Sequence, residues 1–299
     1  MPRRPVNAAH RFEARARAFW DARQKAASNA GFSGYLLDES PPGIGQRRFA
    51  GEWADFQSLL PAAQAHAHCL DLGCGTGLWT QALARQFAQV EAWDYAPAMA
   101  RAARLRLRQA GLRNARVHSG RIETRPGRAV FDLIFVGGVL MYCPEASLPR
   151  LLRALRRLLK PGGTLILRES CSRDHGWVRE GLALRPGLLA QTTAPETDYV
   201  AIYRSAPAVR SALQTAGFEV RRERSNRHYK FSDLTEDWLR RLNRLSGGRL
   251  TRHAAASEKA AAWIYAWRWI LLYPEYALRR WRLNNRWFVC KNNQRRSST

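Results

Sequence analysis

The stretch Leu70-Asp71-Leu72-Gly73-Cys74-Gly75-Thr76-Gly77 decides the fold of this chain. The apolar residues before Gly73 predict a short buried strand. The three glycines predict a sharp turn that lets the backbone approach a ligand closely. A helix predicted from about Leu78 then directs its N-terminus toward the same ligand. The motif therefore predicts a ligand-binding edge of a parallel α/β sheet.

The glycine spacing excludes two common nucleotide sites. A dinucleotide fingerprint requires a third glycine at position 78, where this chain has Leu78, and no Lys-Ser/Thr pair forms a phosphate loop. Purely structural glycines at a strand–helix turn remain the alternative for the motif by itself.

The next predicted strand, Val90–Asp94, ends in a carboxylate. A carboxylate at the end of this strand can accept hydrogen bonds from both hydroxyls of a ribose. The alternative is a helix N-cap, because Ala96-Pro97-Ala98 follows, and the two roles are compatible.

Short apolar segments alternate with helical stretches between residues about 61 and 225, which predicts parallel βαβ units in a sheet covered on both faces. The expected strands are His68–Leu72, Val90–Asp94, Ala115–His118, Phe131–Val136, Thr164–Leu167 and Phe218–Arg221, with Arg286–Lys291 as the last. We divide the chain into an N-terminal helical segment (1–60), this core (61–225), a basic helical insertion (226–282) and a final strand with its tail (283–299). Ser40–Gly45 is expected to be a loop.

Five segments in order and spacing resemble the class I S-adenosylmethionine-dependent methyltransferases, in the branch that acts on small molecules, lipids and glycans. They are Leu70–Gly77, Asp94–Met99, Phe131–Ile134, Val139–Tyr142 and Leu159-Lys160-Pro161-Gly162-Gly163. The resemblance covers about half of the chain. It implies a Rossmann-like, doubly wound, seven-stranded, mostly parallel sheet whose last strand is antiparallel, with S-adenosyl-L-methionine as cofactor.

The resemblance also implies roles for individual residues around the cofactor. Asp71 would orient the methionine end, and Gly137 would line it. Asp94 would hold the ribose, while Tyr95 and Met99 would flank the adenine. The turn itself would be formed by Gly73, Cys74, Gly75 and Gly77.

One position departs from the family pattern. The family usually places an acidic residue after the third strand, facing the adenine amine, and this chain has Arg121 followed by Ile122. Arginine cannot accept that hydrogen bond. We therefore expect either that backbone groups near Ile122 contact the adenine or that its recognition is weaker.

Candidates for catalysis lie beyond the fifth strand, where doubly wound sheets bind ligands. Glu169 and His175 are plausible proton acceptors, with an ordinary polar loop as the alternative. Tyr203 and Arg204 could face an anionic acceptor, or simply belong to a short strand or a segment leading into a helix. A cysteine nucleophile is not expected, because direct methyl transfer needs no covalent intermediate.

The insertion is rich in tryptophan and arginine. Ala260–Tyr273 is apolar except for Arg268 and is shorter than the ~20 residues that span a bilayer. Trp263 and Trp267 share a helical face. These features indicate a lid over the acceptor, a contact with an anionic membrane, or both, and less strongly a nucleic-acid contact.

The formal charge of +25 favours anionic partners, although arginine as a default surface residue is the simpler explanation. The five cysteines form no C-x-x-C pair, which disfavours zinc and disulfides and indicates a reducing compartment. We expect a cytoplasmic protein that is either free or peripheral at the inner face of the membrane. The Arg-rich start leaves an organellar transit peptide as an alternative.

Three functions remain open: methylation of a small molecule, lipid or lipid-linked glycan; methylation of RNA; and a non-catalytic binding module. Against RNA, Val136-Gly137-Gly138-Val139 does not resemble the Asn/Asp-Pro-Pro-Tyr/Phe loop of enzymes that methylate base amines. A loose likeness of Phe19-Trp20-Asp21 to protein N-terminal methyltransferases leaves a protein acceptor as a further possibility.

Overall fold

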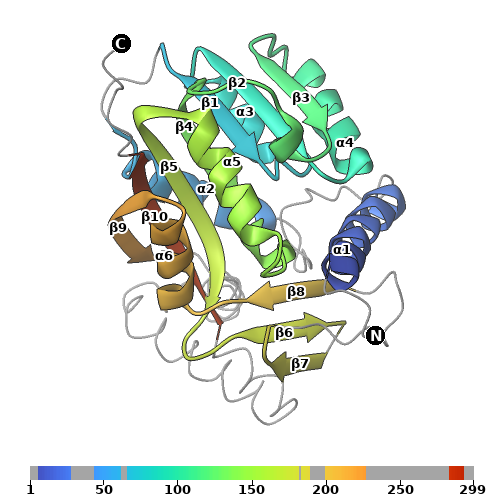
Figure 1. The fold of residues 1–299 in the computed structure, drawn as a ribbon. Helices are drawn as coiled ribbons and strands as arrows, with labels where there is room; N and C mark the ends of the chain where they lie inside the picture. Colours follow the sequence, from blue (N-terminus) through green and yellow to red (C-terminus); the bar gives the residue numbers. More distant parts are fainter. Residues whose placement is uncertain are drawn as a thin grey trace, which may run out of the picture.

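Seven strands form one twisted sheet in the order β3-β2-β1-β4-β5-β10-β9 (Figure 1). The structure is a computed structural model that describes residues 6–27, 44–61, 66–181, 183–188, 199–226 and 283–292. The strands are β1 (His68–Leu72), β2 (Gln89–Asp94), β3 (Ala115–Ser119), β4 (Phe131–Gly137), β5 (Leu159–Ser172), β9 (Phe218–Ser225) and β10 (Leu283–Asn292). Strands β1 to β5 pair in parallel, and β10 runs antiparallel to both β5 and β9. The predicted fold class is confirmed.

The central strands are apolar on both faces, as a sheet covered on both sides requires. In β4, Ile134 and Val136 belong to one hydrophobic cluster, while Leu133 and Phe135 belong to the cluster on the opposite face. This alternation follows from the two-residue period of a strand.

Helices α2 (Ile44–Gln57), α3 (Leu78–Ala84), α4 (Pro97–Gln109), α5 (Leu148–Leu158) and α6 (Ala206–Thr215) pack against the main sheet. Helix α1 (Val6–Ala27) lies to the side of it, and the short 3₁₀ turns are η1 (Ile122–Thr124) and η2 (Leu140–Tyr142). In α5, leucines at spacings of three and four are buried, whereas Arg150 and Arg153 are exposed. That spacing places the leucines on one face of the helix.

A second, three-stranded antiparallel sheet lies beside the main one and was not predicted. It consists of β6 (Trp177–Glu180), β7 (Ala183–Pro186) and β8 (Val200–Tyr203), in the order β7-β6-β8. The polar loop considered after the fifth strand is in part a strand, because β5 continues to Ser172.

The predicted loop at Ser40–Gly45 falls on residues outside the described ranges, except for Ile44 and Gly45, which begin α2.

Helix α1 contacts both α4 and β8, and so links the main sheet to the second one (Figure 1). Phe12 and Ala16 pack against Val178 and Ile202 of the second sheet. Arg15 forms a 2.9 Å ion pair with Glu180. The helix is thus fixed against the second sheet by apolar packing and by charge.

Strands β9 and β10 flank the sequence of the basic insertion, as predicted, but residues 227–282 themselves lie outside the described ranges. In the part of the chain that is described, no helix has the length and hydropathy to cross a bilayer.

Candidate functional site

The glycine turn adopts backbone conformations that favour glycine. Gly73, Gly75 and Gly77 have φ values of 75°, 54° and 83°. A Cβ on Gly77 would lie 2.9 Å from the Cα of Ala103, whereas a Cβ on Gly75 would meet no atom within 4 Å. Gly77 therefore lets α3 and α4 pack closely, and Gly75 borders open space.

Asp94 holds this turn through its carboxylate. Oδ2 accepts a 2.8 Å hydrogen bond from the N–H of Gly75, and Oδ1 accepts one of 2.8 Å from the N–H of Ala96. The residue at the N-cap of α4 is Ala96, so the N-cap alternative for Asp94 is wrong. Because an ionised carboxylate offers about four acceptor positions, Asp94 can still receive ribose hydroxyls.

Burial raises the pKa of Asp94 to about 6, with the Asp21 charge adding to the effect, although the two backbone hydrogen bonds oppose it. Asp71 is buried at the end of β1 and accepts a 2.6 Å hydrogen bond from Thr80 Oγ1. Its pKa is raised to about 7 by burial. Cys74 is buried as well, and its pKa is raised for the same reason.

Two arginines lie over the ring of Tyr95, which is expected to flank the adenine. The Arg121 guanidinium lies over the ring of Tyr95 at 4.9 Å from its centroid, and Arg17 of α1 lies at 5.4 Å. Met99 and Ile122 are both about 2% exposed. Arg121 also donates a hydrogen bond to Glu13 of α1, a partner that the sequence analysis did not identify.

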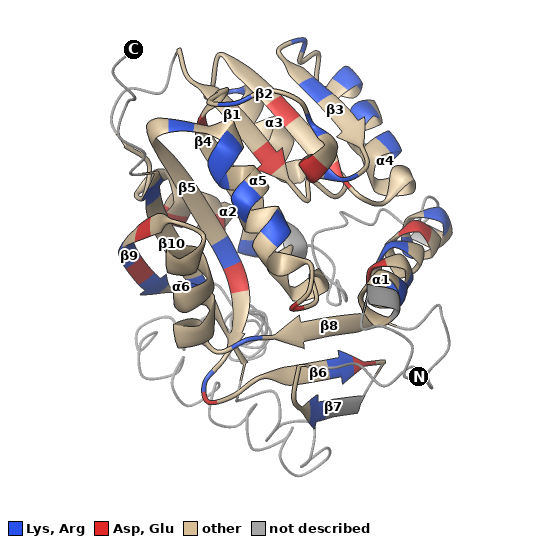
Figure 2. Ribbon diagram, viewed as in Figure 1, with Lys and Arg blue, Asp and Glu red and all other residues tan. Residues whose placement is uncertain are grey.

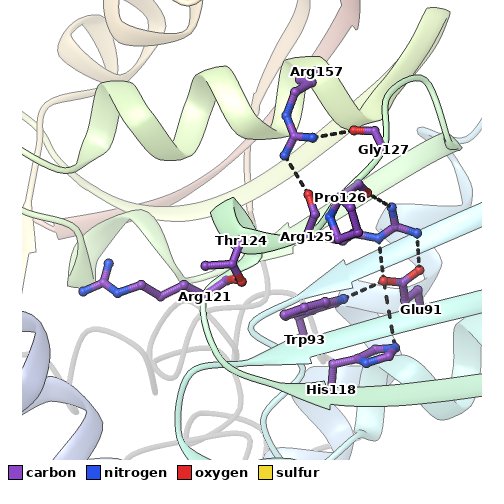
Figure 3. A network of polar contacts seen from close by, with 9 residues as sticks. All are labelled: Glu91, Trp93, His118, Arg121, Thr124, Arg125, Pro126, Gly127 and Arg157. Atoms are coloured by element: carbon purple, nitrogen blue, oxygen red, sulfur yellow. Dashed lines mark hydrogen bonds and ion pairs between the residues drawn. The ribbon is translucent and has the colours of Figure 1, made fainter.

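A polar network holds the segment that carries Arg121 (Figure 3). Glu91 accepts hydrogen bonds of 2.6 and 2.7 Å from Arg125 and one of 2.7 Å from Trp93. Arg157 of α5 donates to the carbonyls of Arg125 and Gly127. The Arg121 side chain points away from this network in Figure 3, so its backbone is held while its guanidinium faces α1.

Glu169 lies at the carboxyl-terminal part of β5, next to η2. Its Oε2 accepts a 2.8 Å hydrogen bond from the N–H of Leu140, and Oε1 accepts one of 3.3 Å from the N–H of Ser170. Glu169 is 3% exposed, and burial raises its pKa to about 7. A carboxyl group that titrates near neutrality suits a general base.

Gly137 ends β4 beside this group. It pairs in register with Arg168, the residue before Glu169, and a Cβ on Gly137 would lie 3.7 Å from Arg168 Nη2. The predicted methionine side of the cofactor and the proposed base therefore lie on adjoining strands.

Three tyrosines form a chain of hydroxyl groups near η2. The hydroxyl of Tyr199 lies 3.4 Å from those of Tyr142 and Tyr203. Burial raises the pKa of Tyr142 and of Tyr199, so both hydroxyls keep their protons at neutral pH. Only Tyr203 was a predicted site residue. Tyr142 and Tyr199 carried no catalytic signal in the sequence, because their neighbourhood depends on the second sheet.

His175 and Arg204, which were considered as a proton acceptor and as a contact for an anionic acceptor, lie in other surroundings than expected. The imidazole of His175 is 52% exposed, 3.5 Å from Asp174 and stacked on Trp177, with no contact to Glu169 among the described residues. Arg204 is buried and donates to the carbonyls of Leu140 and Cys143 as well as to Glu145. Its donors therefore hold η2, which corrects the expectation that they face an anionic acceptor.

Replacing Asp94 with alanine should weaken binding of S-adenosylmethionine by about 2 kcal/mol or more, because hydrogen bonds to a carboxylate are lost. Calorimetry measures the change, and a thermal melt confirms that the variant is folded. Wild-type affinity should also fall as the pH drops through about 6, where Asp94 becomes protonated. Unchanged affinity in a folded variant would refute the ribose assignment.

Comparison with known proteins identifies a methyltransferase domain in this chain. Residues 69–163 match the family model described as a methyltransferase domain. Over 121 residues the chain is 36% identical to trans-aconitate 2-methyltransferase of Deinococcus radiodurans, covering 40% of this chain and 44% of that protein. Over 104 residues it is 38% identical to ubiquinone biosynthesis O-methyltransferase of Xanthomonas axonopodis pv. citri, covering 34% and 43%. The match thus spans less than half the length of these relatives.

Two solved structures share the fold over most of this chain. The [4+2]-cyclase SpnF has a TM-score of 0.60 at 21% identity, with 92% of this chain and 94% of that chain covered. Phosphoethanolamine N-methyltransferase 2 of Haemonchus contortus, in complex with S-adenosyl-L-methionine, has a TM-score of 0.57 at 14% identity, with 92% and 57% covered. At these identities the likeness shows the fold alone. The segment over residues 69–163 belongs to the class I S-adenosylmethionine-dependent methyltransferase domains, whose cofactor is S-adenosyl-L-methionine.

Proposed function

We propose that the protein transfers a methyl group from S-adenosylmethionine to a small-molecule acceptor. The observation that carries this proposal is the Gly73–Gly77 turn tied to Asp94, which leaves space at Gly75 and acceptor capacity on the carboxylate. The names of the two curated relatives describe methylation of trans-aconitate and an O-methylation in ubiquinone biosynthesis, which supports a small molecule as acceptor.

When bound, S-adenosylmethionine supplies a methyl group made electrophilic by its sulfonium. The protein has to align the acceptor in line with it and to remove a proton if the acceptor atom starts protonated. We assign the proton removal to Glu169. As the bond from the acceptor oxygen or nitrogen to the methyl carbon forms and the carbon–sulfur bond breaks, its carboxylate takes the acceptor proton.

The tyrosine chain is the proposed binding surface for the acceptor. Because the hydroxyls of Tyr142 and Tyr199 stay protonated, they can donate to an oxygen of the acceptor and accept from a protonated group. Trp20 and Phe19 of α1 and Trp177 of β6 surround them with aromatic surface. This composition suits a compact acceptor with both polar and apolar parts.

The experiment that tests the function uses isotopically labelled S-adenosylmethionine. The protein is incubated with cell extract, which is then separated into small-molecule, lipid, glycan and RNA fractions for mass spectrometry. We expect label in the small-molecule fraction, and much less of it with the Asp94→Ala variant at a subsaturating concentration of S-adenosylmethionine. Label only in the RNA fraction would contradict the proposal.

RNA is the second candidate, favoured by the formal charge of +25. Exposed arginines lie along α4 and near β3, among them Arg101, Arg108, Arg113 and Arg116 (Figure 2). However, β3 is an edge strand of the main sheet. Charged residues on an edge strand also prevent unwanted strand pairing, which is a second explanation for these arginines. The charge alone therefore does not outweigh the small-molecule relatives.

A third candidate is a protein of this fold that binds the cofactor without methyl transfer. The fold likeness to the [4+2]-cyclase SpnF illustrates that one fold supports several chemistries. Cofactor binding without label in any fraction would favour it.

For the basic insertion of a cytoplasmic protein we propose a lid over the acceptor that can also touch the anionic inner face of the membrane. The support is its sequence alone, in which the four-residue spacing of Trp263 and Trp267 predicts one helical face and arginines follow. Co-sedimentation with anionic vesicles at low salt tests the membrane contact, and its absence would leave only the lid.

A further inference from the structure

The adenine of the expected cofactor presents an amino group that must donate a hydrogen bond when it is buried. The position that follows β3 holds Arg121, whose guanidinium has only donors. The guanidinium lies against Tyr95, the residue expected to flank the adenine. The loop after β3 therefore places a donor, rather than an acceptor, beside the expected adenine.

A buried carboxylate lies beside this guanidinium. Glu13 of α1 is 5% exposed and accepts a hydrogen bond from Arg121 through Oε2. An ionised carboxylate has about four acceptor positions. Arg121 occupies the only one that a described hydrogen bond uses.

Glu13 is held in this place by the docking of its helix. On one side Asp21 accepts a 2.7 Å hydrogen bond from the N–H of Ala98 at the start of α4. On the other side Arg15 pairs with Glu180 of β6 at 2.9 Å. Glu13, Arg17 and Asp21 follow one another at four-residue spacing, so all three side chains lie on the α1 face that meets the cofactor side.

We propose that Glu13 supplies the hydrogen-bond acceptor for the adenine amino group, and that α1 therefore contributes a specificity residue to the cofactor site. The proposal rests on the proposed function, since it assumes that S-adenosylmethionine binds at the glycine turn. Arg121 then orients the Glu13 carboxylate and neutralises its charge, which makes its burial beside the adenine feasible.

The test compares two ligands by calorimetry. One is S-adenosylhomocysteine, and the other is its analogue with hydrogen in place of the 6-amino group. The wild-type protein should prefer the amino form by about 10-fold or more, because a hydrogen bond to a charged acceptor is lost in the analogue. Glu13→Met, which keeps the length of the side chain but has no strong acceptor, should bind the two ligands equally well.

Three matched variants separate this role from a structural one. Glu180→Met breaks the ion pair that joins Arg15 of α1 to β6 and should keep the preference for the amino form. Arg121→Lys keeps a cationic donor beside the carboxylate, and it should keep the preference even if Glu13→Met fails to fold. Glu123→Met tests the second carboxylate near Arg121, which lies 3.9 Å away, and should also keep it.

The outcomes that would overturn the inference are distinct. Equal loss of affinity for both ligands in Glu13→Met would mean that Glu13 only anchors α1 and does not contact the adenine. Loss of the preference in Glu123→Met would move the acceptor from Glu13 to Glu123, and loss of the preference in Arg121→Lys would contradict the role given to Glu13. A wild-type protein that binds both ligands equally refutes the inference alone, whereas one that binds neither refutes the proposed function.

Discussion

Replacing Gly77 with alanine is expected to lower the free energy of unfolding by about 3 kcal/mol. The backbone at Gly77 has φ of 83°, which costs an L-residue about 1–2 kcal/mol. In addition, the new Cβ would lie 2.9 Å from the Cα of Ala103. Because the obstacle is backbone in α4, the helices must separate, and overpacking of this kind costs about 1–3 kcal/mol. Denaturant unfolding measures the change.

Gly75→Ala is the matched control within the same turn. Its φ of 54° also penalises alanine, but its Cβ meets no atom within 4 Å. We expect a loss of stability of only about 1 kcal/mol, together with clearly weaker binding of S-adenosylmethionine, because the Cβ enters space assigned to the ligand. Equal destabilisation by the two variants would contradict the different roles of the two glycines.

Glu169→Gln should lower the rate of methyl transfer by about 10²-fold or more, the usual contribution of a positioned general base. The amide oxygen of glutamine can still accept the hydrogen bond from the N–H of Leu140, so η2 should keep its place. The effect should appear in kcat and leave the affinity for the cofactor nearly unchanged. Steady-state kinetics with the identified acceptor measure both quantities.

The pH dependence provides a second readout of Glu169. Its pKa is about 7, and only the ionised form can take a proton, so kcat/KM should rise as the pH passes upward through about 7. The raised pKa also means that the folded state binds this proton more tightly than the unfolded chain. The stability that Glu169 contributes should therefore be present below pH 4.5 and decrease as the pH rises to about 7. The Glu169→Gln variant should lack this pH dependence of stability.

Glu145→Gln is the control for a purely structural role near η2. Glu145 is exposed and pairs at 2.6 Å with Arg204, which itself donates to the carbonyls of Leu140 and Cys143. We expect nearly normal activity and an unchanged pH profile. If Glu145→Gln reduced activity as strongly as Glu169→Gln, the base assignment would be wrong and Glu169 would be an anchor of η2.

The strands of the main sheet were predictable because each is a short apolar run next to a strong signal. The glycine turn marks the end of β1, and Asp94 the end of β2. Errors were confined to strand ends: β5 was expected from Thr164 to Leu167 and extends from Leu159 to Ser172. Its added residues include Lys160 and Glu169, whose partners Asp132 and Leu140 appear only after folding.

The second sheet and the role of α1 were not predictable from local patterns. Strands β6 and β7 are four residues each and carry no clear alternation of apolar and polar residues. Glu13 resembled an ordinary polar position in an Arg-rich helix, and its burial depends on a contact with Arg121 more than 100 positions away in sequence. Likewise, Tyr142 and Tyr199 come together only when β8 packs on η2.

The central claim is that the Gly73–Gly77 turn and Asp94 form a site for S-adenosylmethionine. Competition binding of S-adenosylmethionine against NAD on the purified protein tests it most directly. Because position 78 is leucine and the turn lacks the dinucleotide spacing, we expect S-adenosylmethionine to bind and NAD to displace it poorly. Tighter binding of NAD, or no binding of S-adenosylmethionine by the folded protein, would contradict the assignment.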